Sequence, residues 1–173
     1  FNNDIKYERL NKTIFNLPHS FYSISLSNHY HISSTFKKDV FELYFRGNKL
    51  YAGKTADLGE FTYNQIFYQQ LNFTFGHNFN RNENNFGYSA GLSLNKGQKL
   101  YKISASRASL FTEINGEYID LDAKLEILQS DSSKNNINDW NGTGCSADFS
   151  FFWKDQKNNK LKLSAKNFGF IIW

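Results

Sequence analysis

The fold class is decided by one stretch of sequence, Phe86-Gly87-Tyr88-Ser89-Ala90-Gly91-Leu92-Ser93-Leu94, in which apolar residues alternate with Gly and Ser. A period of two is the pattern of a β-strand, whose successive side chains point to opposite faces. Residues 70–79 alternate in the same way, and the polar residues 80–84 join the two runs. Two alternating runs around a short Asn-rich connection predict a β-hairpin.

The same alternation recurs along most of the chain. It is clear in four further segments: 22–32, 119–127, 145–153 and 161–172. Residues 100–114 form a more irregular run. The total is about eight strands at roughly 20-residue spacing, which suits the smallest transmembrane barrels. We therefore predict an all-β fold, an antiparallel up-and-down meander.

Breaks in the alternation predict where the strands end. Lys96-Gly97 and Asn115-Gly116 predict tight turns, and the mixed residues 39–45 predict a short helical turn. We expect one β domain over residues 1–173, with residues 1–18 as an irregular N-terminal segment.

The composition agrees with strands and excludes several classes of protein. Aromatic residues make up 18% of the chain although its mean hydropathy is −0.58, so apolar and polar residues must be separated finely, as in strands. The net charge is +4, but the basic residues are scattered, which argues against nucleic acid as a partner. The single Cys145 excludes an internal disulfide and a multi-cysteine zinc site, and its alternating context predicts a small buried residue.

Three features favour a transmembrane β-barrel, with the lipid bilayer as partner, over a soluble β-protein. The apolar faces are long, and approach the ~9–11 residues that a tilted spanning strand needs. The alternate face is small and neutral in one strand and charged in another. Aromatic residues also gather near strand ends, as in the girdles at membrane interfaces. These are Tyr22, Tyr30, Phe86, Tyr88, Phe151, Trp153, Phe168, Phe170 and Trp173.

Polar residues on the alternate faces are candidates for the barrel interior. They are His29, His31, Arg107, Asp120, Asp122, Lys124, Glu126 and Asp148. We expect Asp148 to point inward and to need a partner, with Arg107 or a lysine as the candidate. The pair His29 and His31 lacks further ligands at metal-binding spacing, and no catalytic motif or cofactor fingerprint is visible. We predict structural roles for these residues, with no cofactor, no metal and no enzymatic activity.

Four segments resemble an uncharacterised family of Gram-negative outer-membrane β-barrels that is distantly like fatty-acid transporters. They are Gly47-Asn48…Gly53, Gly87 to Leu94, Gly144-Cys145-Ser146-Ala147-Asp148-Phe149, and Leu161 to Trp173. The resemblance covers most of the chain from about Tyr22 onward. Members of that family are much longer, so the resemblance implies a portion of a larger barrel or a shortened relative. It supplies location and architecture, and little chemistry.

The resulting hypothesis is a bacterial outer-membrane β-barrel, or part of one. Its role would be a pore, hydrophobic-solute transport, or structure and assembly with other outer-membrane or periplasmic proteins. The alternative is a soluble secreted or periplasmic β-protein that binds a lipid or glycan through its aromatic residues.

Overall fold

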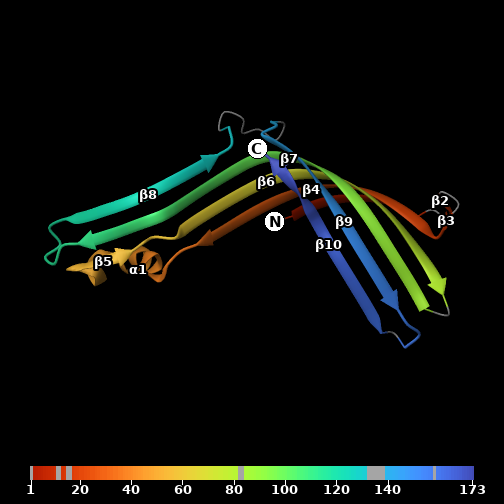
Figure 1. The fold of residues 1–173 in the computed structure, drawn as a ribbon, viewed down its shortest axis with the longest axis horizontal. Coiled ribbons are helices and arrows are strands. Elements are labelled where there is room, and N and C mark those ends of the chain that lie inside the picture. Colours follow the sequence, from red (N-terminus) through yellow and green to blue (C-terminus); the bar gives the residue numbers. More distant parts are fainter. Residues whose placement is uncertain (1, 11–12, 15–16, 82–83, 132–138, 158) are drawn as a thin grey trace. The chain divides into compact units, whose positions relative to one another are not determined.

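The computed structural model of the chain is built from antiparallel strands and one short helix (Figure 1). It describes residues 2–10, 13–14, 17–81, 84–131, 139–157 and 159–173. In chain order the elements are β1 (Asn2–Leu10), β2 (Thr13–Ile14), β3 (Leu17–Pro18), β4 (Ser20–Thr35), α1 (Lys38–Arg46), the 3₁₀ helix η1 (Asn48–Tyr51), β5 (Lys54–Asp57), β6 (Phe61–Arg81), β7 (Asn84–Thr112), β8 (Ile119–Gln129), β9 (Gly142–Lys154) and β10 (Lys160–Ile172).

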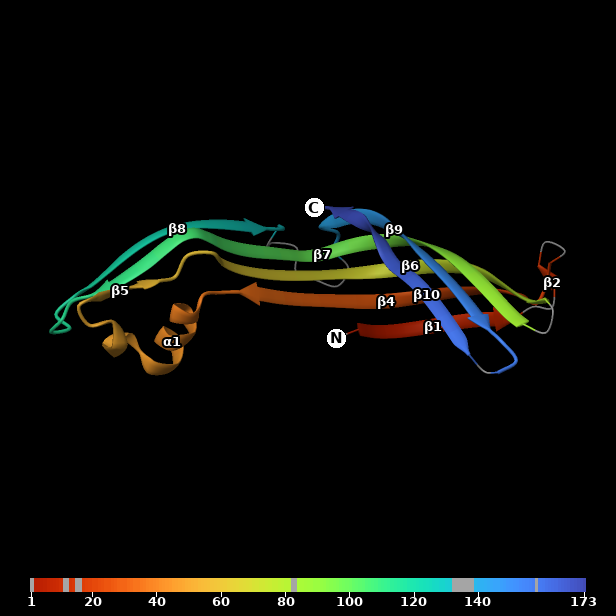
Figure 2. The same cartoon turned by 60° about the horizontal axis from the view of Figure 1, so that its bottom comes forward.

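Eight of the strands form one sheet, and its topology confirms the all-β prediction. The order β1-β4-β6-β7-β9-β10 follows the chain, as an up-and-down meander requires, and β5 and β8 also pair with β7. The small strands β2 and β3 form a separate pair. The N-terminal segment was expected to be irregular, but its described residues include β1, which pairs antiparallel with β4 (Figure 2).

Contacts divide the chain into two compact units, which share the long strands β4, β6 and β7. Unit 1 comprises the described residues within Phe1–Tyr30, Phe67–Gln98 and Lys134–Trp173. Unit 2 comprises those within His31–Ile66 and Lys99–Ser133.

The turn predicted at Lys96-Gly97 is wrong, because β7 runs without a break for 29 residues. It pairs with β9 over residues 85–97 and with β8 over residues 101–112. Gly97 serves close packing instead of a turn. A Cβ atom there would lie 2.8 Å from a ring carbon of Trp173 and 3.0 Å from the Cα atom of Gly142.

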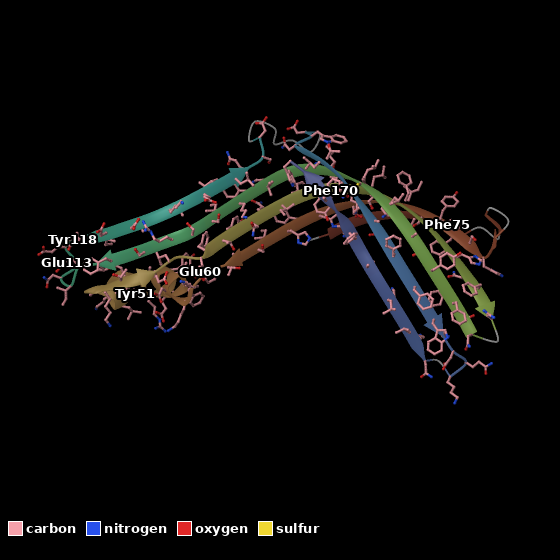
Figure 3. The ribbon with its side chains drawn as sticks, viewed as in Figure 1. Tyr51, Glu60, Phe75, Glu113, Tyr118 and Phe170 are labelled. Carbon is pink, nitrogen blue, oxygen red and sulfur yellow. The ribbon has the colours of Figure 1, made fainter. Side chains whose placement is uncertain are left out.

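Other sequence signals have the predicted meaning. The mixed stretch at residues 39–45 is helical in α1, which ends at Gly47 with a positive φ of 70°. Asn115-Gly116 forms the turn between β7 and β8, where the Gly116 N–H donates to the Glu113 carbonyl at 2.9 Å. Glu113 and Tyr118 lie at this turn (Figure 3). Within the described residues, no helix is long and apolar enough to cross a membrane.

The last strand, β10, contains an irregularity that coincides with a change in its alternation of apolar residues. Apolar residues occupy odd positions up to Ala165 and even positions from Phe168. In the structure the register between β9 and β10 shifts between these two residues. Asn167 adopts a positive φ of 56° at this point. The insertion is a β-bulge, which re-aims side chains and bends a strand.

Candidate functional site

Unit 1 has an inverted distribution of polar and apolar side chains. In the described part of this unit the buried residues other than glycine are polar: Ser20, Ser23, Ser27, His29, Gln70, Asn72, Ser93, Asn95, Gln98 and Ser146. Large apolar side chains of the same strands are exposed, such as Leu92 at 71% and Leu94 at 63%. We call the two sides of this sheet the polar face and the apolar face.

The polar face is crowded, and this explains why β7 alternates with such small residues. A Cβ atom on Gly91 would lie 2.8 Å from the Thr74 hydroxyl oxygen and 3.4 Å from the Asp148 Cβ atom. A Cβ atom on Gly87 would collide with the ring of Phe152. Larger side chains have no room at these positions.

Asn72 on β6 is one centre of a hydrogen-bonded network on the polar face. Its Nδ2 atom donates to the Ser93 hydroxyl at 2.7 Å and to the Asp148 carboxylate at 2.8 Å. Its Oδ1 atom accepts from the Thr74 hydroxyl at 2.6 Å. The amide thus uses both of its functional groups, as a buried amide must to offset its loss of hydration.

Gln70, two residues earlier on the same face, is the second centre. Its Oε1 atom lies 3.0 Å from the His29 Nε2 atom, and because a carbonyl oxygen only accepts, the imidazole is the donor. Its Nε2 atom donates to the Ser146 hydroxyl at 3.0 Å and to the Asn167 Oδ1 atom at 2.9 Å. The His29 ring also stacks on Tyr68, with ring centroids 4.6 Å apart. Gln70 therefore connects β4, β6, β9 and β10.

Asp148 belongs to this network, but the partner expected for it is wrong. Its carboxylate accepts from Asn72 and, at 2.6 Å, from the backbone N–H of Asn167. The bulge in β10 turns that N–H toward the carboxylate. Arg107, one of the expected partners, instead forms an ion pair with Asp122 at 3.0 Å in unit 2. Among the described residues, no lysine, the other expected partner, forms an ion pair with Asp148.

A groove of about 460 Å³ adjoins the network. Its lining is rich in hydroxyl and amide groups from β4, β6, β9 and β10. Phe21 and Phe149 supply aromatic surface, and Lys162 and Lys166 supply positive charge. Such a lining offers hydrogen bonds to a polar group, beside the charged side chains of Asp148, Lys162 and Lys166.

The remaining predicted interior residues do not join this network. His31 is exposed on β4 and belongs to unit 2. Asp120, Asp122, Lys124 and Glu126 lie on β8, which is exposed along its whole length. Among the described residues, no group of three or more metal-binding side chains is close enough to hold an ion.

Most of the aromatic residues predicted at the membrane interface occupy the alternate strand positions that belong to the apolar face. Phe168 is 80% exposed, and Tyr30, Tyr88, Phe151 and Phe170 are also exposed. The side chains of Tyr22, Phe86 and Trp153 are half-buried. Phe170 is labelled in Figure 3.

Trp173 and Cys145 have surroundings that differ from those expected from the sequence. The ring of Trp173 lies against Gly97 and Gly142, so it is half-buried and packs over glycine backbone. Cys145 was expected to be buried, but it is exposed. It pairs with Leu94 on one side and Phe170 on the other, both exposed residues of the apolar face.

The two amides that organise the network were not predicted from the sequence. Gln70 and Asn72 appear there only as polar positions of an alternating strand, and Asn167 lies in the predicted strand 161–172 without a role of its own. One sequence signal could have identified these amides: β6 has large amide side chains where β7 has Gly and Ser. Residues of β7 must be small where a long polar side chain from β6 lies across them.

Comparison with known proteins gives a family and no nearer relative. Neither a curated protein nor a solved structure matches the chain. A family model described as a family of unknown function (DUF5723) matches residues 1–173, and the chain therefore belongs to that family.

Proposed function

We propose that the chain forms all or part of the wall of a β-barrel in the bacterial outer membrane, with the apolar face of unit 1 against lipid. The observation that carries the proposal is the inverted burial in this unit. In water a sheet buries its apolar face, whereas in a bilayer that face turns outward and polar groups pair inside. A network built on Gln70 and Asn72 beside an exposed Leu92 fits the second environment.

The length of β7 indicates which part of the strand would span. At about 3.3 Å per residue, its 29 residues greatly exceed the ~9–11 that cross the hydrocarbon layer. The strict alternation at residues 86–94 has the required length, and its exposed positions are apolar. We therefore assign the span to unit 1 and place α1, η1 and β5 outside it.

The lining of the polar face favours a structural or polar-lumen role over transport of hydrophobic solutes. An apolar solute in the groove would displace water from hydroxyl and amide groups without replacing its hydrogen bonds. The groove supplies mainly Ser, Thr, Asn and Gln side chains. No catalytic role is proposed.

An arginine scan along β7 tests the membrane assignment. Single substitutions Phe86→Arg, Tyr88→Arg, Ala90→Arg, Leu92→Arg and Leu94→Arg would be made, and the free energy of unfolding measured by urea titration in bilayers. An arginine on the lipid face costs about 2–4 kcal/mol at the midplane and about 0–1 near the interfaces. We expect a bell-shaped profile with its maximum at Ala90 or Leu92.

The control is Leu121→Arg on the exposed β8, outside the assigned span, where the cost should be small. A flat profile along β7 would contradict the membrane assignment. Reversible folding of every variant in lipid-free buffer would also contradict it, and would favour the soluble binding protein. Resistance to carbonate extraction and heat-dependent gel mobility of the wild type provide a second, independent measurement.

A further inference from the structure

The helix α1 is attached to unit 2 in an unusual orientation. None of its residues is buried. At 3.6 residues per turn, Val40, Phe41, Tyr44 and Phe45 fall on one side of it. The three aromatic side chains are exposed, and Tyr44 reaches 83%. The helix is strongly amphipathic, yet its aromatic side has no described partner that covers it.

The polar side of α1 holds the helix in this orientation. Glu42 accepts a hydrogen bond from the Tyr51 hydroxyl at 3.0 Å, and Asp39 accepts one from the Asp57 backbone N–H at 2.9 Å. Tyr51 is buried, and this burial, with Glu42 beside it, raises the pKa of the phenol, so the hydroxyl stays a donor. Tyr51 lies beside α1 in Figure 3. These bonds would be lost if the helix rolled its aromatic side inward.

The surroundings of α1 contain three cations besides those held in ion pairs. Residues 37–60 have five basic and four acidic side chains, a net charge of +1. Lys37 pairs with Asp57 and Glu60, and Lys38 pairs with Glu42. Arg46, Lys49 and Lys54 are exposed. Exposed apolar residues also lead up to the helix along β4, through Ile32 to Phe36.

We propose that α1 binds the interface of a lipid bilayer, with Phe41, Tyr44 and Phe45 in the boundary between headgroups and acyl chains. An aromatic side flanked by Lys and Arg is the pattern of an interfacial helix, and the cations fit anionic headgroups. A protein partner is less suited to this surface. Nine residues span only about 14 Å, whereas a stable protein interface needs ~800 Å² per partner. The inference rests on the membrane location proposed above.

Single fluorescent labels on the full chain test this inference and separate it from the spanning of β7. Cys145→Ser removes the native thiol, and Tyr44→Cys, Arg46→Cys or Leu92→Cys then carries an environment-sensitive fluorophore. Each labelled protein is folded into vesicles of phosphatidylcholine and phosphatidylglycerol. Quenching is measured with iodide in water and with lipids that carry a doxyl group at a shallow or a deep position.

The label at Tyr44 should show a blue-shifted emission and lose intensity to the shallow doxyl lipid, since interfacial helices lie about 5–10 Å into the headgroup and acyl boundary. The label at Arg46, on the opposite side of the same helix, should lose intensity to iodide alone. Phe45→Cys repeats the Tyr44 measurement at a second aromatic position. The label at Leu92 reports the spanning strand and should lose intensity to the deep doxyl lipid.

Two outcomes would overturn the inference. Iodide quenching at Tyr44 equal to that at Arg46 would mean that the aromatic side faces water. Protection of Tyr44 from both iodide and doxyl lipids would mean that protein covers it, either a second copy or another partner. Quenching of Tyr44 but not Leu92 by doxyl lipids would support α1 at the interface and reject the spanning strand.

Discussion

The two units of this chain differ in the residues that they bury, although both consist of alternating antiparallel strands. In its described part, unit 2 buries one polar residue, Thr112, beside its hydrophobic ones. The buried hydrophobic residues among those described all belong to unit 2, and three of the four are alanines: Tyr51, Ala56, Ala105 and Ala108. Unit 1 buries amides, serines and a histidine. Alternation therefore establishes that a strand has two different faces, and the neighbouring side chains decide which one is buried.

The polar interactions of the two units differ in the same way. Asn72 is buried and has three hydrogen-bond partners, which lie on β6, β7 and β9. The ion pair of Arg107 and Asp122 in unit 2 is largely exposed, with side chains 74% and 64% accessible. Water can replace a lost partner in the second case but not in the first, so equal-looking contacts should have unequal effects on stability.

The substitution Asn72→Leu should therefore have the largest effect. It keeps the side-chain size but removes both donated hydrogen bonds, and each buried group left unsatisfied costs about 1–3 kcal/mol. We expect a loss of about 2–4 kcal/mol in the free energy of unfolding, measured by urea titration in bilayers. The matched change in unit 2, Arg107→Gln, should cost at most about 1 kcal/mol. Equal losses for the two variants would mean that the polar face of unit 1 is hydrated.

The substitution Gly91→Val should have an intermediate effect, because it adds volume to the crowded polar face. Overpacking typically costs about 1–3 kcal/mol. The control is Ala90→Val, the adjacent residue on the exposed apolar face, which should change stability little. The same urea titration compares the two variants. If Ala90→Val proved as harmful as Gly91→Val, crowding could not explain the small residues of β7.

Much of this architecture follows from local sequence. The hairpin of β6 and β7 follows from period-two alternation, α1 from residues that break it, and the bulge in β10 from its phase slip at Lys166 and Asn167. Each of these signals lies within a few residues of the feature that it predicts. The turn at Asn115-Gly116 is of the same kind.

Features that depend on distant residues could not be predicted in this way. Lys96-Gly97 has the composition of a turn, but Gly97 is needed where Trp173 and Gly142 approach its backbone. The partner of Asp148 depends on Asn72, which lies 76 residues away, and on a bulge in β10. Position along the chain contains no information on such contacts, so Arg107 was assigned to the wrong carboxylate.

The smallest expected effect is a dependence of stability on pH that arises in unit 2. The variant Gly91→Val in unit 1 should not change with pH in this way. The hydrogen bond from Lys37, at 2.7 Å, holds the pKa of the Asp57 carboxyl below its ordinary 3.8 and raises the pKa of Lys37 above its ordinary 10.5. The Asp57 contribution is therefore present above pH 3.8 and is lost as the pH falls through the lower folded value. The Lys37 contribution is present below pH 10.5 and is lost as the pH rises through the higher folded value.

The measurement is the difference in urea midpoint between wild type and Asp57→Asn across pH. This difference should be present at pH 7 and should shrink as the pH falls below 3.8, because the wild-type carboxyl then becomes neutral as well. For Lys37→Gln the difference should shrink above pH 10.5. The substitution Gly91→Val removes and adds no titratable group. Its difference in urea midpoint from the wild type should therefore stay the same over the whole pH range. An Asp57→Asn deficit that persisted in acid would place its cause outside the carboxylate, in the hydrogen bond between the Asp57 backbone N–H and Asp39 on α1.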